Sequence, residues 1–127
     1  MPGAYDWYQK GLKLLSSGDN HAAAMLLERA AAEESGKSSI HEALARAYFG
    51  SRRFDDALVQ FGLVLEISPA NDYAHFGTGL CLRRLGRFSE AVGHLRMANV
   101  MHPENEDYRR ELALSEARLA ISRKERR

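Results

Sequence analysis

Residues 38–71 read SSIHEALARAYFGSRRFDDALVQFGLVLEISPAN, and the segment directly after them repeats the same pattern of residue types. Residues 72–105 align with this segment over 34 residues without a gap, and residues 4–37 form a third, more diverged copy. Equivalent positions in the second and third copies include His41 and His75, Phe54 and Phe88, Ala57 and Ala91, and Pro69 and Pro103. A fixed period of this length is typical of stacked repeats, in which each repeat packs only on its neighbours.

Within each copy, the spacing of apolar residues predicts two helices joined by a short turn. The predicted first helices span residues 5–17, 39–51 and 73–85, and the predicted second helices span residues 20–34, 54–67 and 88–101. Gly18 and Gly86 suit the left-handed residue that ends a helix. The second copy has Arg52 at this place, which predicts a slightly different or mildly strained turn.

Short polar residues mark several predicted helix starts. Asn71 or Asp72 and Asn105 can cap the helices that follow Pro69 and Pro103. Residues 39–42, with the sequence SIHE, have the spacing of a capping box.

The repeated positions resemble the tetratricopeptide repeat (TPR) family, whose pattern combines W-x2-L-G-x2-Y with later A, F and P positions. The residues that carry the resemblance are Trp7 and Gly11 in the first copy, Leu44, Ala45, Tyr48, Ala57, Phe61 and Pro69 in the second, and Gly79, Ala91 and Pro103 in the third. The resemblance implies an all-α fold, a right-handed α-solenoid of three helix pairs followed by a C-terminal capping helix. It implies a single TPR domain over residues 1–127, with repeats at 4–37, 38–71 and 72–105 and the capping helix at 106–124. It also implies a scaffold that binds other proteins.

The two ends of the predicted array differ from its middle. The face of the first helix that would meet a preceding repeat is polar and consists of Asp6, Lys10, Lys13 and Ser17. The last helix turns Tyr108, Leu112, Ser115 and Leu119 toward the third repeat, whereas the face that would meet a following helix carries Arg109, Ala113 and Glu116. We therefore expect a self-capped array of three repeats.

A third face of the predicted first helices lines the concave wall in the family that the chain resembles. The predicted partner-binding groove consists of Tyr5, Tyr8, Leu12, Glu42, Ala43, Arg46, Phe49, Tyr73, Phe76, Gly77, Leu80 and Arg83. Aromatic residues with arginine, and few lysines or aspartates, are typical of the core of an interface. The alternative is that these aromatic side chains pack on one another within the chain.

One TPR subclass holds acidic C-terminal tails with a carboxylate clamp of Lys, Asn and Arg. The corresponding positions here are Tyr8, Leu12, Ala43, Tyr73 and Gly77, and none matches. We therefore expect an apolar or aromatic partner segment, with one acidic group near Arg46 and Arg83.

The charge and composition of the chain narrow the classes of partner. Lys and Arg number 18 against 17 Asp and Glu, so no nucleic-acid partner is expected. Residues 118–127 are basic, which fits either a contact with RNA or acidic lipid, or a solvated helix end that the helix dipole favours. No membrane span and no secretory signal are predicted, and the single cysteine fits a cytoplasmic location.

No residue pattern predicts an enzyme, a cofactor or a metal site. The sequence contains no P-loop, no GxSxG motif and no paired carboxylates. His41 and His75 occupy equivalent positions, where packing is expected rather than metal binding, and Cys81 lies on a predicted packing face.

Three functional hypotheses follow. The first is a cytoplasmic adaptor or chaperone-like module that holds a partner peptide in the groove. The second is a homodimer through Leu114, Ala117 and Ile121, which leave an apolar stripe on the last helix. The third is a regulatory subunit of an enzyme.

Overall fold

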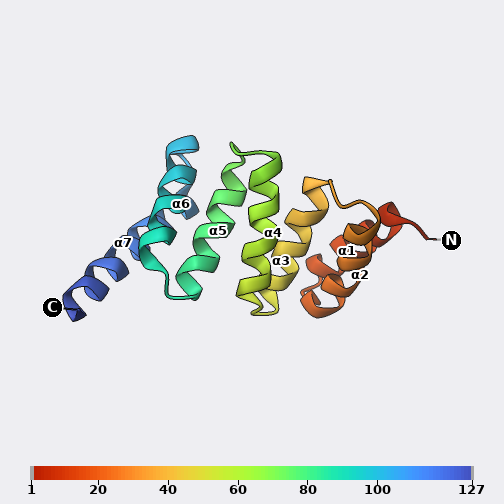
Figure 1. The fold of residues 1–127 in the computed structure, drawn as a ribbon, viewed down its shortest axis with the longest axis horizontal. Helices are drawn as coiled ribbons and strands as arrows, with labels where there is room; N and C mark the ends of the chain where they lie inside the picture. The colour runs from red at the N-terminus through yellow and green to blue at the C-terminus, as the bar shows by residue number, and fades with distance from the viewer. Residues whose placement is uncertain (1, 127) are drawn as a thin grey trace. The chain divides into compact units, whose positions relative to one another are not determined.

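The computed structural model describes residues 2–126, and this part of the chain forms seven α-helices and no strand. They are α1 (Ala4–Ser16), α2 (Asn20–Glu33), α3 (Ser38–Gly50), α4 (Phe54–Ile67), α5 (Asp72–Arg84), α6 (Phe88–Met101) and α7 (Glu106–Glu125), as Figure 1 shows. The predicted all-α repeat fold is confirmed, and the predicted ends of the six paired helices lie within one residue of the observed ones.

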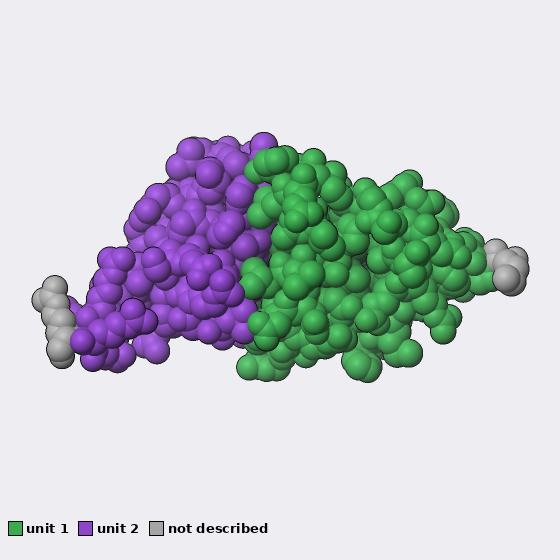
Figure 2. All heavy atoms as spheres, in the orientation of Figure 1, with its two compact units in different colours: residues 1–69 green, residues 70–127 purple. Residues whose placement is uncertain are grey.

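The helices group into two compact units, coloured separately in Figure 2. Unit 1 ends at Pro69 and contains α1–α4, and unit 2 begins at Ala70 and contains α5–α7. The single domain over residues 1–127 stays a prediction, and each unit is described by itself below.

The turns between paired helices follow the glycine pattern of the sequence. Gly18 and Gly86 have φ values of 81° and 79°, and Arg52 has a φ of 62° at the equivalent place. A side chain in this left-handed region is strained, as predicted for Arg52. The guanidinium of Arg53, the next residue, lies 4.2 Å from the ring centroid of Tyr48, which helps to hold this turn against α3.

Asparagine caps begin α5 and α7. The Oδ1 atom of Asn71 accepts a hydrogen bond from the backbone nitrogen of Ala74 at 2.9 Å, and Asn105 accepts from that of Tyr108 at 3.0 Å. The capping box predicted at residues 39–42 is wrong, because α3 begins one residue earlier. Its N-cap is Lys37, which makes no side-chain capping bond.

Unit 1 consists of two helix pairs, α1 with α2 and α3 with α4, and α2 also packs on α3. Its buried side chains include Leu27, Leu44, Phe61 and Val64. The hydroxyl of Tyr48 donates to Oε2 of Glu28 at 2.7 Å and so joins α3 to α2. Burial, together with this carboxylate, raises the pKa of Tyr48 to about 12. The polar face predicted for α1 is exposed at Asp6, Lys10, Lys13 and Ser17.

In unit 2, α6 packs between α5 and α7. The core cluster of this unit contains Val92, Leu95 and Leu112, with Phe76, Leu80 and Leu119 partly buried against it. Tyr108 is buried, and its hydroxyl donates to Oδ2 of Asp72 at 2.6 Å. The face of α7 predicted to pack therefore covers the unit, whereas Arg109, Ala113 and Glu116 on another face are exposed.

Candidate functional site

The predicted groove residues of unit 1 lie on α1 and α3 with very different exposure. Tyr5 is 73% exposed, which is unusual for a large aromatic side chain. On α3, the groove residue Ala43 is buried, and the groove residue Arg46 is exposed. The others, Tyr8, Leu12, Glu42 and Phe49, are half-buried.

A hollow of about 240 Å³ opens beside two of these residues. It is lined by Ala4, Tyr5 and Tyr8 of α1, by Glu34 and Lys37 of the segment after α2, and by Ser39 and Ile40 of α3. The two tyrosine rings and Ile40 give this hollow an apolar wall, while Glu34 and Lys37 place opposite charges at it. Such a cavity suits a side chain that is apolar and ends in a polar group.

The predicted groove residues of unit 2 lie on α5 and are partly used by the unit itself. Phe76 and Leu80 pack against the core cluster, and Gly77 is buried. The ring centroid of Phe76 lies 4.7 Å from that of Tyr108 and 6.4 Å from that of Tyr73. Aromatic side chains thus pack on one another in unit 2, as the alternative interpretation of the sequence expected, and Tyr73 keeps 36% of its surface exposed.

Arg83 already has a carboxylate partner within the chain. Its Nη1 atom lies 2.5 Å from Oε2 of Glu111 on α7, and both side chains are largely covered. From the sequence, Arg83 was expected to lie near an acidic group of the partner. The ion pair with Glu111 changes this expectation, because a partner carboxylate would first have to displace an intrachain one.

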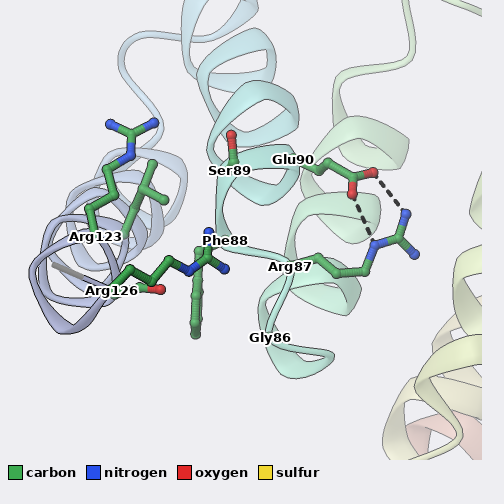
Figure 3. A pocket seen from close by; sticks show the side chains of 9 residues that line it. Gly86, Arg87, Phe88, Ser89, Glu90, Arg123 and Arg126 are labelled. Atoms are coloured by element: carbon green, nitrogen blue, oxygen red, sulfur yellow. Dashed lines mark hydrogen bonds and ion pairs between the residues drawn. The ribbon is translucent and has the colours of Figure 1, made fainter.

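Unit 2 contains a second hollow, of about 370 Å³, that was not predicted from the sequence (Figure 3). It lies between the start of α6 and the last turns of α7, and its lining residues are Gly86, Arg87, Phe88, Ser89, Glu90, Leu119, Ser122, Arg123 and Arg126. Arg87 pairs with Glu90 through two bonds of 3.0 and 2.8 Å, drawn as dashed lines in Figure 3. Arg123 and Arg126 belong to the basic residues 118–127. This basic segment was the feature of the sequence that could have indicated the hollow.

Cys81 is the single cysteine of the sequence, and its side chain is buried. Burial raises the pKa of the Cys81 thiol to about 12, which keeps it protonated at neutral pH and therefore a poor nucleophile. Within residues 2–126, no cluster of three or more His, Cys, Asp or Glu side chains could hold a metal ion. Within the same residues, no helix is both long enough and apolar enough to cross a membrane.

Comparisons with known proteins agree with the repeat fold. Two family models described as tetratricopeptide repeat match residues 43–106 and residues 14–61. Superkiller complex protein 3 of Mus musculus is 28% identical over 102 residues, which are 80% of this chain and 6% of that protein. Cell division cycle protein 27 homolog A of Arabidopsis thaliana is 35% identical over 63 residues, which are 50% of this chain and 9% of that protein. The chain thus spans less than a tenth of the length of these two relatives.

Solved structures with the same fold include domains of several different proteins. The first TPR of Spaghetti (RPAP3) bound to the HSP90 peptide SRMEEVD has a TM-score of 0.87 at 20% identity, covering 92% of this chain and 93% of that one. MamA AMB-1 has a TM-score of 0.80 at 25% identity, covering 92% of this chain and 64% of that one. With one family model covering residues 43–106, half of the sequence, the chain belongs to the tetratricopeptide repeat family.

Proposed function

We propose that this chain binds an apolar or aromatic segment of a partner protein through the predicted groove residues. The TPR family is generally a non-enzymatic protein-interaction fold, so a protein partner is the expected ligand. The observation that carries the specific proposal is the 240 Å³ hollow lined by Tyr5 and Tyr8, with Tyr5 left 73% exposed. Tyrosines beside a concave surface are typical anchors of protein interfaces.

The chemistry of the groove residues favours a ligand unlike an acidic tail. The structure of the RPAP3 domain holds the acidic peptide SRMEEVD. In this chain the positions that correspond to a carboxylate clamp carry Tyr8, Leu12, Ala43, Tyr73 and Gly77, which offer no cationic group. Arg83 is paired with Glu111, so it adds no unpaired positive charge on α5. The proposed ligand therefore anchors through an apolar or aromatic side chain, and Arg46, which is exposed on α3, is the cation proposed to meet its acidic group.

Partner capture followed by alanine substitution tests this proposal. Partners captured from the native cell are identified by mass spectrometry, and the affinity of the purified pair is then measured by calorimetry. Tyr5→Ala with Tyr8→Ala should weaken binding by roughly 30-fold or more, since interface anchors contribute about 2 kcal/mol or more. Lys10→Ala is the matched control, because Lys10 is exposed on the polar face of the same helix. Equal affinity of the tyrosine variant and the wild-type protein would refute the proposed site.

A homodimer is a second candidate, favoured by the exposed apolar residues of α7. Leu114 is 54% exposed, Ile121 is 46% exposed, and Ala117 between them is exposed as well. If these side chains pair two copies, light scattering at micromolar concentration should give twice the monomer mass, and Ile121→Glu should restore the monomer. A monomeric wild-type protein over this concentration range would remove the dimer hypothesis.

Regulation of an enzyme remains a third role, in which the groove ligand would be a segment of that enzyme. We place all three roles in the cytoplasm, on the evidence of the single cysteine.

A further inference from the structure

A pair of histidines faces across the helix pair α5 and α6 in unit 2. The Nδ1 atoms of His75 and His94 lie 3.1 Å apart. The ring planes differ by 29°, and the ring centroids are 5.3 Å apart. The distance between the ring centroids exceeds the distance between the Nδ1 atoms by about two ring radii. The two rings therefore meet edge to edge, with their Nδ1 atoms pointing toward each other, and do not stack face to face. Both side chains are half-buried, so water reaches the pair.

The equivalent place in the second repeat has a different pair and provides a reference. His41 is equivalent to His75, and Gln60 is equivalent to His94, because each lies 34 residues earlier. The Nε2 atom of His41 donates to the backbone carbonyl of Ser35, which can only accept. The Nδ1 atom of His41 lies 2.7 Å from Oε1 of Gln60, and a neutral His41 needs this amide turned so that its NH2 group faces the ring. In the second repeat a ring nitrogen thus faces an amide, whereas in the third repeat two ring nitrogens face each other.

The spacing of the two nitrogens in unit 2 matches that of ligands on one cation. Metal–nitrogen bonds of about 2.0–2.1 Å place two histidine nitrogens about 2.9 Å apart at a right angle and about 3.3 Å apart at a tetrahedral angle. The observed 3.1 Å lies between these values. For both lone pairs to converge on one cation, each ring must tilt away from the line that joins the two nitrogens.

We propose that His75 and His94 form a two-histidine site for a divalent transition-metal cation such as Cu²⁺ or Zn²⁺. In the metal-free pair one Nδ1 donates and the other accepts. On metal binding the donor ring moves that proton to Nε2 by exchange with water, which leaves both Nδ1 lone pairs for the cation. Glu90 lies one turn before His94 but is held by Arg87. Water, or a side chain of a bound partner, completes the coordination.

The surroundings of His94 shift the pKa of its ring. Burial first, and the neighbouring His75 second, lower the pKa of His94 below its ordinary value, while Glu90 opposes this shift. This direction favours the neutral imidazole, which is the form that binds a metal. Imidazole nitrogens favour Cu²⁺ over Zn²⁺, so the affinity should follow that order.

The test uses the untagged full chain and three variants. Zn²⁺ titration by calorimetry at pH 7.5 measures affinity and stoichiometry, and electron paramagnetic resonance with Cu²⁺ counts the nitrogen ligands. His94→Gln recreates the histidine–glutamine pair of the second repeat and should weaken binding by at least about tenfold. Gln60→His builds the same pair in unit 1 and should add a second site. His102→Ala removes an exposed histidine elsewhere and should change nothing.

Each result bears on the proposal. The proposal is supported if the wild-type protein binds one equivalent of metal through two nitrogen ligands. This binding should be lost in His94→Gln and kept in His102→Ala. A wild-type protein that binds no Zn²⁺ and no Cu²⁺, or a His94→Gln variant that binds with wild-type affinity, overturns it. Circular dichroism of His94→Gln checks that the helices are retained, so that a loss of binding reports the ligand and not the fold.

Discussion

Ending the chain after Asn105 should destabilise unit 2 enough to cause aggregation or partial unfolding. The truncation removes α7, whose Tyr108 and Leu112 are buried and whose Leu119 packs against the core cluster. Fully burying one leucine side chain stabilises a protein by about 1.5–3 kcal/mol, and a typical domain has only about 5–15 kcal/mol in total. Val92 and Leu95 would lose their cover, and Tyr108 would no longer bond Asp72. Thermal unfolding followed by circular dichroism, with light scattering for aggregation, measures the effect.

Two leucines on α7 give the matched control for this interpretation. Leu112 is buried in the core cluster, whereas Leu114, two residues later, is 54% exposed. Leu112→Ala should cost about 2–5 kcal/mol of unfolding free energy, and Leu114→Ala should stay within about 0.5 kcal/mol. If the two substitutions had equal effects, or if the truncated protein stayed soluble with an unchanged melting temperature, α7 would not be the cap of unit 2.

The helices, turns and end faces could be predicted because they depend on local chemistry. Gly18 and Gly86 adopt the left-handed conformation that their residue type allows, and the polar face of α1 stays exposed because no apolar side chain favours its burial. Residue spacing alone placed Tyr108, Leu112 and Ser115 on one buried face of α7. The capping box at residues 39–42 failed for a local reason as well, since α3 starts one residue before the serine that was expected to cap it.

The partners of long polar side chains could not be predicted in the same way. The ion pair between Arg83 and Glu111 joins residues 28 positions apart, and their meeting depends on how α5, α6 and α7 pack together. The hollow beside Phe88 has the same origin, because it exists only where the end of α7 passes the start of α6. The repeat period, by contrast, does indicate that Gln60 and His94 are equivalent positions. It does not indicate that His94 turns its Nδ1 atom toward His75.

Gly79→Ala should lower the stability of unit 2, although alanine is the better helix former. A Cβ atom built on Gly79 lies 2.6 Å from Cγ of Leu95 and 3.2 Å from the backbone oxygen of Ala91. Cγ is the branch point of a fully buried side chain and the other atom is backbone, so neither can move aside cheaply. Overpacking of this kind costs about 1–3 kcal/mol, against a gain of about 1 kcal/mol in helix propensity.

Gly93→Ala in the same unit is the control with the opposite sign. Gly93 is exposed on α6, and a Cβ atom built there meets nothing within 4 Å. This substitution gains about 1 kcal/mol of helix propensity without a clash. Because both variants share that gain, the difference between their unfolding free energies isolates the overpacking cost of about 1–3 kcal/mol at Gly79. Urea unfolding of the two proteins measures this difference. Equal stabilisation by both alanines would mean that α5 and α6 are free to move apart at Leu95. In that case, the close approach of α5 and α6 would not explain the glycine at residue 79.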